Sequence, residues 1–227
     1  LMSLILDIDT AYEKAHVSFA DNGIILHCIW NESQKEHASF LQSGILQLTK
    51  TSGIKLSDID AVAVTAGPGS YTGLRVGMAS AKGLCYALKK PLITMNTLEV
   101  LTLSAIHLFP GNDNPTLLCP MIDARRMEVF TAIYRKDLSI YLSPSPLILD
   151  ESSLASALLE NKILFFGNGS PKWEQVCKSA NAQFADVVIQ PEAMSKYSHK
   201  LCFQRHFTEL AYSEPLYLKE FQTVIKA

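Results

Sequence analysis

The segment 61–88 restricts the folds open to this 227-residue chain more than any other stretch of its sequence. An apolar run, Ala61–Val64, is followed by the turn Gly67-Pro68-Gly69-Ser70 and then by a segment whose only charges are Arg75 and Lys82. This order predicts a strand, a loop and a helix that ends near residue 88. Backbone N–H groups and the positive end of the helix dipole meet at such a junction, which suits an anion. The alternative is a tight turn that binds no ligand.

This glycine turn does not match the known nucleotide-binding motifs. No Gly-Lys-Ser/Thr follows it, so the P-loop signature is absent. Gly67, Gly69 and Gly73 miss the G-x-G-x-x-G spacing of dinucleotide-binding proteins by one residue. Ser70 or Thr72 can cap the start of the predicted helix.

The predicted helix carries two rows of small residues. One row is Gly73, Gly77 and Ala81, because residues four apart share one face of a helix. A glycine inside a helix costs about 1 kcal/mol relative to alanine, so close packing must compensate for it. We expect one row to pack on the helix's own sheet and the other to receive a helix from another chain. The parallel row consists of Ala79, Gly83 and Ala87.

The order of the predicted elements occurs twice along the chain. Three strands with hairpins, a helix, a strand, a glycine turn and a helix are predicted before a turn-rich break at Pro110–Pro115, and again after it. The second glycine turn is Gly167-Asn168-Gly169-Ser170. Mixed hairpin and crossover connections predict an α/β fold of two duplicated lobes with a cleft between them. The predicted lobes comprise residues 1–110 and 111–227.

Aspartates end the first strand of each predicted lobe. Asp7 and Asp9 are two residues apart, so both carboxylates leave the same face of the first strand, and Asp123 ends the corresponding strand of the second lobe. Paired carboxylates at a strand end can hold a metal ion or polarise a water molecule. The alternative is that one carboxylate caps a turn while the other is solvated. The phosphatase motif D-x-D-x-T fits poorly, because Thr10 comes one position early. The candidate residues for binding an anion or nucleotide are Asp7, Asp9, Gly67, Gly69, Ser70, Asp123, Gly167 and Gly169.

Composition argues against several classes of function. The formal net charge of −2 gives no global attraction to nucleic acid. The six histidines include no pair three or four residues apart, so no helical two-histidine metal site is predicted. Five cysteines without a C-x-x-C motif predict reduced thiols, and no G-x-S-x-G nucleophile elbow occurs. Because the sequence has no signal-peptide pattern and no apolar run near the ~20 residues that span a bilayer, we expect a cytoplasmic protein.

Several of these motifs together resemble the TsaB family of bacterial proteins. The resemblance is strongest over residues 61–99 and extends to Leu6–Thr10, Ile122–Arg125 and Glu214–Leu218. It implies an actin-like ATPase (ribonuclease H-like) fold of two duplicated lobes, which glycoprotease-like proteins share. It also implies a part in making threonylcarbamoyladenosine beside the tRNA anticodon.

The resemblance also bears on a metal site. The related TsaD family carries its metal on a helix reading Asn-His-Leu-Glu-Gly-His, which aligns with Asn96–Leu101 of this chain. Thr97 and Leu101 then stand in place of the two histidines, and neither can serve as a ligand there. The resemblance therefore implies no metal, no catalytic residue and a vestigial nucleotide or anion site. It implies that this chain requires no cofactor, with ATP or ADP bound weakly or by a larger complex.

The partners implied by the resemblance are proteins of the same pathway. A support subunit of this family would form a heterodimer with TsaD, join TsaE in a larger complex, reach tRNA through that complex and form a homodimer when alone, without contacting a membrane. The alternative is an autonomous enzyme of the same fold, either a metal-independent peptidase or an ATP-using kinase. Lys219 stands where relatives often have arginine, and an ammonium group lacks the bidentate geometry of a guanidinium group. The implied interface residues are Leu41, Ile45, Leu48, Gly73, Arg75, Gly77 and Ala81.

Overall fold

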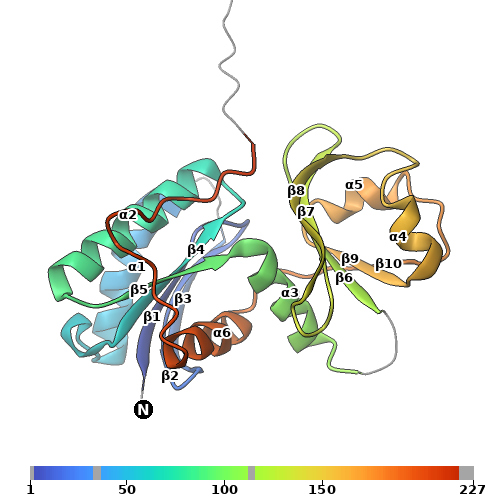
Figure 1. The fold of residues 1–227 in the computed structure, drawn as a ribbon. Helices are drawn as coiled ribbons and strands as arrows, with labels where there is room; N and C mark the ends of the chain where they lie inside the picture. The colour runs from blue at the N-terminus through green and yellow to red at the C-terminus, as the bar shows by residue number, and fades with distance from the viewer. Residues whose placement is uncertain (1–2, 33–36, 112–115, 220–227) are drawn as a thin grey trace, which may run out of the picture.

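The computed structural model of the protein describes residues 3–32, 37–111 and 116–219. Two α/β lobes lie side by side, and each is built on a five-stranded mixed sheet (Figure 1). The first sheet consists of β1 (Leu4–Asp9), β2 (Ala15–Asp21), β3 (Ile24–Asn31), β4 (Ala61–Gly67) and β5 (Leu92–Asn96). The second consists of β6 (Leu117–Asp123), β7 (Glu128–Tyr134), β8 (Ile140–Ile148), β9 (Ile163–Phe166) and β10 (Ala182–Ala185).

The two sheets share one topology. Their strand orders are β3-β2-β1-β4-β5 and β10-β9-β6-β7-β8, which coincide when the second is read in reverse. In each sheet the first strand pairs antiparallel with the second and parallel with the strand that precedes the glycine turn. This confirms the predicted fold class, a duplicated ribonuclease H-like α/β fold.

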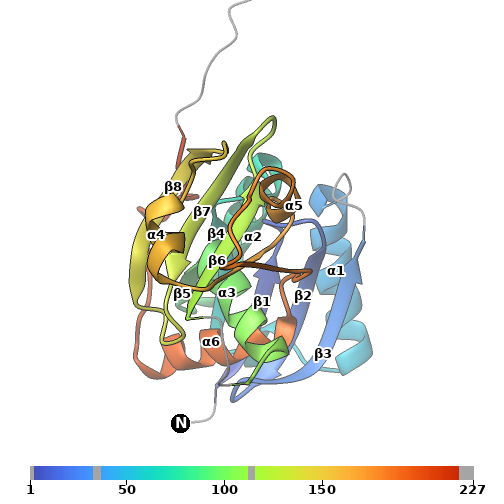
Figure 2. The same ribbon diagram turned by 90° about the vertical axis from the view of Figure 1, so that its right-hand side faces the viewer.

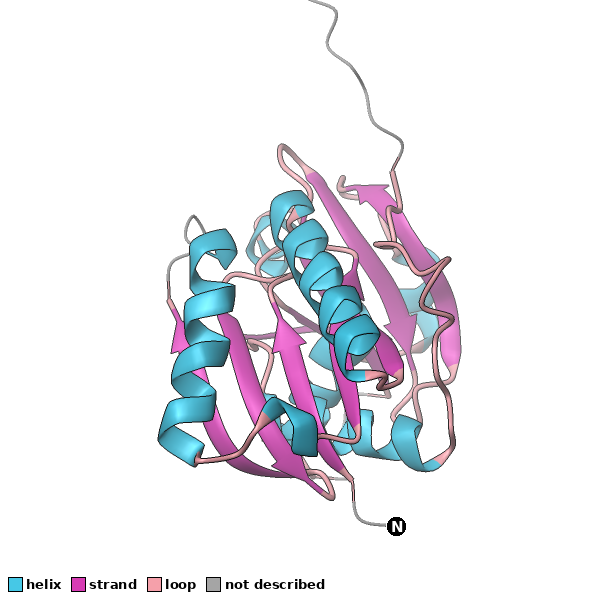
Figure 3. Ribbon diagram, turned by 90° about the vertical axis from the view of Figure 1, so that its left-hand side faces the viewer, coloured by secondary structure: helices cyan, strands magenta, loops and turns pink. Residues whose placement is uncertain are grey.

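Helices cover both faces of the first sheet. α1 (His37–Ser52) and α2 (Tyr71–Leu88) lie across its outer face (Figure 3). α3 (Thr97–Leu108) and α6 (Pro191–Phe203) lie on the opposite face, toward the second lobe. A short 3-10 helix, Leu56–Asp58, precedes β4. The second lobe carries the short helices α4 (Ala155–Glu160) and α5 (Ser170–Glu174), and Figure 2 shows this lobe in front of the first sheet.

The alternation of side chains along β1 explains this layering. Leu6 and Ile8 pack with α1 and α2 in one core cluster, whereas Ile5 belongs to a second cluster that reaches α3, α6 and the second lobe. Because Asp7 and Asp9 share the face of Ile5, their carboxyl groups are directed away from α1 and α2.

The chain returns to the first lobe after it completes the second sheet. α6 packs on β1, β2, β3 and β5, and its Met194 and Leu201 join the core cluster that contains Ile5. Residues 205–219 then run past the edge of β5, where Thr208 bridges Leu92, and along α2 (Figure 1). The predicted boundary placed residues 111–227 in the second lobe, but residues 191–219 pack against the first, because α6 buries its apolar side chains there.

The sequence also predicts a helix over Ser33–Thr51, and the structure describes this helix as His37–Ser52; Ser33 and most of Pro110–Pro115 lie outside the described residues. A second helix is predicted to begin near Asp150. The helix expected near Asp150 begins at Ala155, because the hydroxyl of Ser153 and the carboxylate of Asp150 hold the intervening residues in a turn.

Candidate functional site

The glycine turn between β4 and α2 is closed by the chain's own β1–β2 loop. The backbone N–H of Ser70 donates to the carbonyl of Ala11 over 2.8 Å, so it is not free for an anion. A Cβ atom on Gly69 would collide with that carbonyl, and one on Gly73 would collide with the carbonyl of Thr10. These glycines therefore permit close approach of two backbone segments. Ser70 also caps α2, because its hydroxyl oxygen accepts the N–H of Gly73.

The C-terminal segment closes the other side of this turn. The N–H of Leu216 donates to the carbonyl of Ala66 over 2.7 Å. Gly67 has φ +121° and its Cα approaches the carbonyl of Leu216 so closely that a Cβ atom there would collide with it. The predicted anion cradle at Gly67–Ser70 is thus enclosed by Thr10–Ala11 on one side and by Leu216 on the other.

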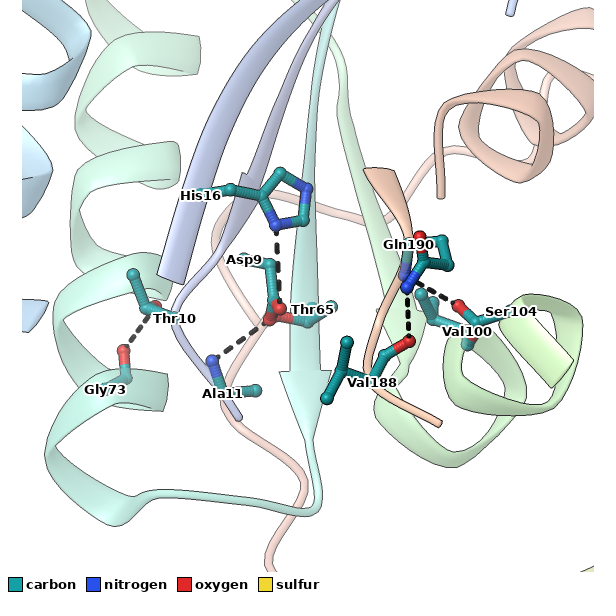
Figure 4. Close-up of polar contacts among 10 residues, drawn as sticks. All are labelled: Asp9, Thr10, Ala11, His16, Thr65, Gly73, Val100, Ser104, Val188 and Gln190. Atoms are coloured by element: carbon teal, nitrogen blue, oxygen red, sulfur yellow. Dashed lines mark hydrogen bonds and ion pairs between the residues drawn. The ribbon is translucent and has the colours of Figure 1, made fainter. Parts of the chain in front are cut away.

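Asp9 lies fully buried beside this turn (Figure 4). Its Oδ1 accepts hydrogen bonds from the hydroxyl of Thr65 at 2.6 Å and from the N–H of Ala11 at 3.1 Å. Its Oδ2 is 3.8 Å from Nδ1 of His16. Burial raises the pKa of Asp9 to about 6 and lowers the pKa of His16 to about 3, so the imidazole is neutral near pH 7. This arrangement orders the β1–β2 loop rather than presenting a carboxylate to solvent.

Asp7 lies two residues before Asp9 on the same face of β1 and is buried underneath α6. Burial raises its pKa to about 7, and neither carboxyl oxygen has a hydrogen-bond partner among the described residues. The neighbouring hydroxyl of Ser198 donates instead to the carbonyl of Ser195. The carboxyl group of Asp7 is therefore not exposed in the cleft. Asp7 and Asp9 leave the same face of the strand, but they do not form a solvent-accessible carboxylate pair.

Asp123 occupies the matching position of the second lobe but has different surroundings. Its Oδ1 is 2.8 Å from Nζ of Lys172 and accepts the N–H of Arg125, while its own N–H donates to Oδ1 of Asn168. The lysine neutralises this carboxylate within its own lobe. No hydrogen bond or ion pair between described residues joins Asp123 to Asp7 or Asp9.

Tyr12 connects the two lobes, and sequence reasoning missed it. Its side chain is 2% exposed, and its hydroxyl oxygen accepts the N–H of Asn168 in the second lobe over 2.5 Å. Gly167, with φ +90°, leaves room for it, because a Cβ atom there would touch both the Tyr12 hydroxyl and Leu101. The available signal was an aromatic residue three positions after Asp9, where the predicted first strand ends.

The positions aligned with the TsaD metal ligands lie in the packed contact between the lobes. Leu101 is fully buried and packs against Gly167. Thr97 is also fully buried, and its hydroxyl has no hydrogen-bond partner among the described residues. Within residues 3–32, 37–111 and 116–219, no group of three or more His, Cys, Asp or Glu side chains is placed to hold a metal ion.

The row of small residues predicted to meet a partner faces the chain's own first lobe instead. Gly77 packs on Thr10 and Val64, and Gly73 and Ala81 are likewise buried. Apart from Arg75, the implied interface residues are all buried, with Leu41, Ile45 and Leu48 in the core cluster under α1 and α2. Arg75 is exposed, stacks 4.0 Å above the ring of Tyr71 and donates to the hydroxyl of Tyr217.

The parallel row on α2 is the solvent-facing one. Ala79, Gly83 and Ala87 are exposed, and nothing lies within 4 Å of a Cβ atom added to Gly83. Leu46 on the adjacent α1 is 55% exposed. Gln42 donates to the hydroxyl of Ser80 and ties the two helices together. Exposed small residues of α2 and the exposed Leu46 of α1 thus lie on two helices that contact each other.

Two further predictions concern the state of the cysteines and membrane-spanning helices. All five cysteines are free, as predicted. None of the helices in the described part of the chain combines the length and apolar character needed to cross a bilayer.

Comparison with known proteins places these features in a family. A sequence model described as TsaD: tRNA N6-adenosine threonylcarbamoyltransferase matches residues 28–215. The chain belongs to this family. Within the TsaD family, it is similar to proteins named tRNA threonylcarbamoyladenosine biosynthesis protein TsaB. The Escherichia coli protein is 34% identical over 133 residues, which cover 59% of this chain and 55% of that protein. The Haemophilus influenzae protein is 28% identical over 95% of this chain and 93% of that protein.

The alignments with the Escherichia coli and Bacillus subtilis proteins cover little more than half of each protein. With the Bacillus subtilis TsaB the identity is 30% over 131 residues, 58% of this chain and 55% of that protein. Among solved structures, a Pseudomonas aeruginosa protein with similarity to peptidase YEAZ superposes with a TM-score of 0.81 at 22% identity, covering 96% of this chain and all of that chain. The P. aeruginosa YeaZ superposes with a TM-score of 0.76 at 24% identity, with the same coverage. These structures share the two-lobe fold of this TsaD-family chain.

Proposed function

We propose that this chain is a non-catalytic support subunit that acts with TsaD and TsaE in threonylcarbamoyl transfer to the tRNA adenosine next to the anticodon. The family match over residues 28–215 and the similarity to proteins named TsaB support this role. The function is one of binding and positioning, with the chemistry carried out by the partner.

The observation that carries the proposal is the packing of Leu101 against Gly167. A metal-dependent transferase of this fold needs ligand atoms and open space where its lobes meet. In this chain a hydrocarbon side chain fills that position, and Thr97 offers a single hydroxyl. The aspartates add no reactive group, because Asp7 and Asp9 are buried away from the cleft and Asp123 is neutralised by Lys172.

The partner would bind to the exposed surface of α1 and α2. Small residues such as Ala79 and Gly83 let another helix approach closely, and Leu46 supplies apolar area. The same surface would serve for a homodimer when the partner is absent. tRNA would then be reached through the complex, because the chain has a net charge of −2.

No nucleotide would be required by this chain itself. ATP or ADP would bind weakly or belong to the complex, since the N–H of Ser70 is engaged by Ala11 and the turn is covered by Leu216.

The test is reconstitution of tRNA modification from purified TsaD, TsaE and tRNA, with and without this chain. Modification that depends on the chain is expected. Leu46→Arg should abolish co-elution with TsaD, whereas the control Leu159→Arg, on a residue of α4 that is 82% exposed, should not. Unchanged co-elution of Leu46→Arg would contradict the interface. Peptidase activity or ATP hydrolysis by the chain alone, lost in Asp9→Asn, would favour the autonomous enzyme instead.

A further inference from the structure

The hairpin between β6 and β7 is strained at two neighbouring arginines. Arg125 has φ +71° and Arg126 has φ +48°, and this is the only place in the described chain where two adjacent non-glycine residues both have positive φ. Hairpin turns with this backbone usually carry asparagine or glycine, because larger side chains are strained there. Two long side chains thus occupy positions at which they destabilise the turn. Strain of this kind is found mainly at functional positions.

Both guanidinium groups of this hairpin are exposed and uncompensated. Neither side chain forms an ion pair or a hydrogen bond with a described residue. The two carboxylates that flank them in sequence already have partners, since Asp123 pairs with Lys172 and Glu128 with Lys219. The hairpin is therefore locally positive, although the whole chain has a formal net charge of −2. Clustered, unpaired guanidinium groups are suited to phosphate.

The C-terminal segment adds a flat ring beside the hairpin. Nζ of Lys219 is 2.6 Å from Oε2 of Glu128, the first residue of β7, so this segment reaches from α2 to the second lobe (Figure 1). Tyr217 is 42% exposed, its ring centroid lies 5.5 Å from that of Tyr71, and its hydroxyl accepts a hydrogen bond from Arg75. Exposed aromatic rings next to arginines are typical of surfaces that bind unpaired nucleotides.

We propose that this hairpin and Tyr217 form a surface that contacts RNA directly. Arg125 and Arg126 each bind a backbone phosphate, and the exposed face of the Tyr217 ring stacks on an unpaired base. The inference rests on the proposed function, because the RNA is the tRNA that the complex modifies. The complex still brings the tRNA to this chain, and these contacts add to those of the partner. An acidic protein segment is a less suitable ligand, because it would leave the tyrosine ring unused.

The experiment titrates a fluorescein-labelled tRNA transcript with the complex of this chain and TsaD at several salt concentrations, and follows fluorescence anisotropy. Arg125→Gln combined with Arg126→Gln should weaken tRNA binding at least tenfold. It should also reduce the steepness of log K against log[salt] by about 1 to 2, because each phosphate contact contributes about 0.7 to 0.9. The matched control, Lys196→Gln combined with Lys200→Gln, removes the same charge from exposed positions of α6 and should change neither quantity.

A second double variant separates binding from folding. Arg125→Asn combined with Arg126→Gly places residues there that tolerate positive φ. It should therefore melt at a higher temperature than the wild type, while its tRNA binding falls as far as that of the glutamine variant. Tyr217→Leu should weaken binding severalfold and leave the salt dependence unchanged, because stacking on a neutral ring releases no counterions.

Unchanged tRNA affinity and salt dependence in an assembled complex with Arg125→Gln and Arg126→Gln would overturn the inference and leave the proposed function intact. Equal weakening in the lysine control would also overturn it, since only a general attraction between cations and RNA would then be present. Loss of co-elution of the arginine variant with TsaD would mean that these side chains bind protein instead. If the wild-type chain fails to co-elute with TsaD, the proposed function is contradicted and the inference falls with it.

Discussion

The hydroxyl oxygen of Tyr12, in the first lobe, accepts a hydrogen bond from the backbone N–H of Asn168, in the second. This bond lies in the buried contact between the lobes, where Gly167 lacks the Cβ atom that would displace the tyrosine. The relative position of the lobes therefore depends on this side chain, on the shared core of α3 and α6, and on the ion pair between Lys219 and Glu128 of β7.

Tyr12→Phe should lower the free energy of unfolding by about 1 kcal/mol, because it removes the acceptor of the partly buried N–H of Asn168. The measurement is urea unfolding followed by circular dichroism. Tyr212→Phe is the control, since Tyr212 is 80% exposed and its substitution should change stability by less than about 0.5 kcal/mol. Equal stability of the two variants would contradict a stabilising role for the Tyr12–Asn168 bond.

Two glycines of α2 should respond in opposite ways to substitution by alanine. Gly83→Ala should stabilise the protein by up to about 1 kcal/mol, because the helix gains propensity and the new methyl group meets nothing within 4 Å. Gly77→Ala should destabilise it, because the methyl group would collide with the hydroxyl of Thr10. Thermal unfolding measures both effects. A stabilised Gly77→Ala would mean that α2 does not press on β1.

The buried carboxyl of Asp7 should make stability depend on pH. Its folded pKa of about 7 lies above its ordinary value of 3.8, so between these limits the folded protein keeps a proton that the unfolded chain has released. The contribution of this acid is therefore fully present below about pH 4 and is lost as the pH rises through about 7, with a limiting slope of about 1.4 kcal/mol per pH unit.

Asp7→Asn isolates this contribution, because Asp9 and His16 titrate in both proteins. The variant should gain stability relative to the wild type between pH 4.5 and 8, measured by urea unfolding at each pH. The opposite trend of His16, whose lowered pKa favours folding at higher pH, cancels in the difference. A difference that stays constant with pH would show that Asp7 ionises normally.

Gly67→Ala should destabilise the protein more than Gly53→Ala. Both glycines have positive φ, but a Cβ atom on Gly67 would collide with the carbonyl of Leu216, whereas nothing lies within 4 Å of one on Gly53. We expect the extra cost to exceed about 1 kcal/mol. Limited proteolysis should then cut Gly67→Ala faster within residues 205–219. Equal cleavage of both variants would mean that the turn does not hold this segment.

Much of the fold could be predicted from the sequence, because strands and turns leave local patterns. The strand that begins at Ala61, the turn after it and the helix that ends near residue 88 were placed correctly, and so was the duplicated strand order. The order of hairpin and crossover connections then determined the two-lobe architecture.

The packing of α6 on the first lobe could not be predicted from the sequence, because this helix lacks a strong apolar pattern. Ser195 and Ser198 are fully buried on the face that covers β1, so the helix has few apolar side chains to mark it. The same limit applies to α2, where the two rows of small residues look alike in sequence. Only the tertiary contact with Thr10 determines which row is buried.

The candidate site was the least predictable part. Glycine, serine and aspartate at strand ends are equally suited to an anion and to a close backbone crossing, and Ala11 and Leu216 decide between these at Gly67–Ser70. The contact of Tyr12 could not be recognised from a local sequence motif, because its partner Asn168 lies 156 positions away in sequence.

The return of the chain to the first lobe makes the second lobe an insertion within it. During synthesis the segment 117–185 leaves the ribosome before α6, so the second sheet has all its strands while α3 alone covers the inner face of the first sheet, and the part over β1, β2 and β3 still lacks α6. Asp7, which lies beside Ser198 of α6, would remain accessible to water until α6 has been synthesised. Before α6 packs on the first sheet, the polar residues that it later covers would thus be exposed to water. An apolar surface at the same place would be more prone to aggregate at this stage.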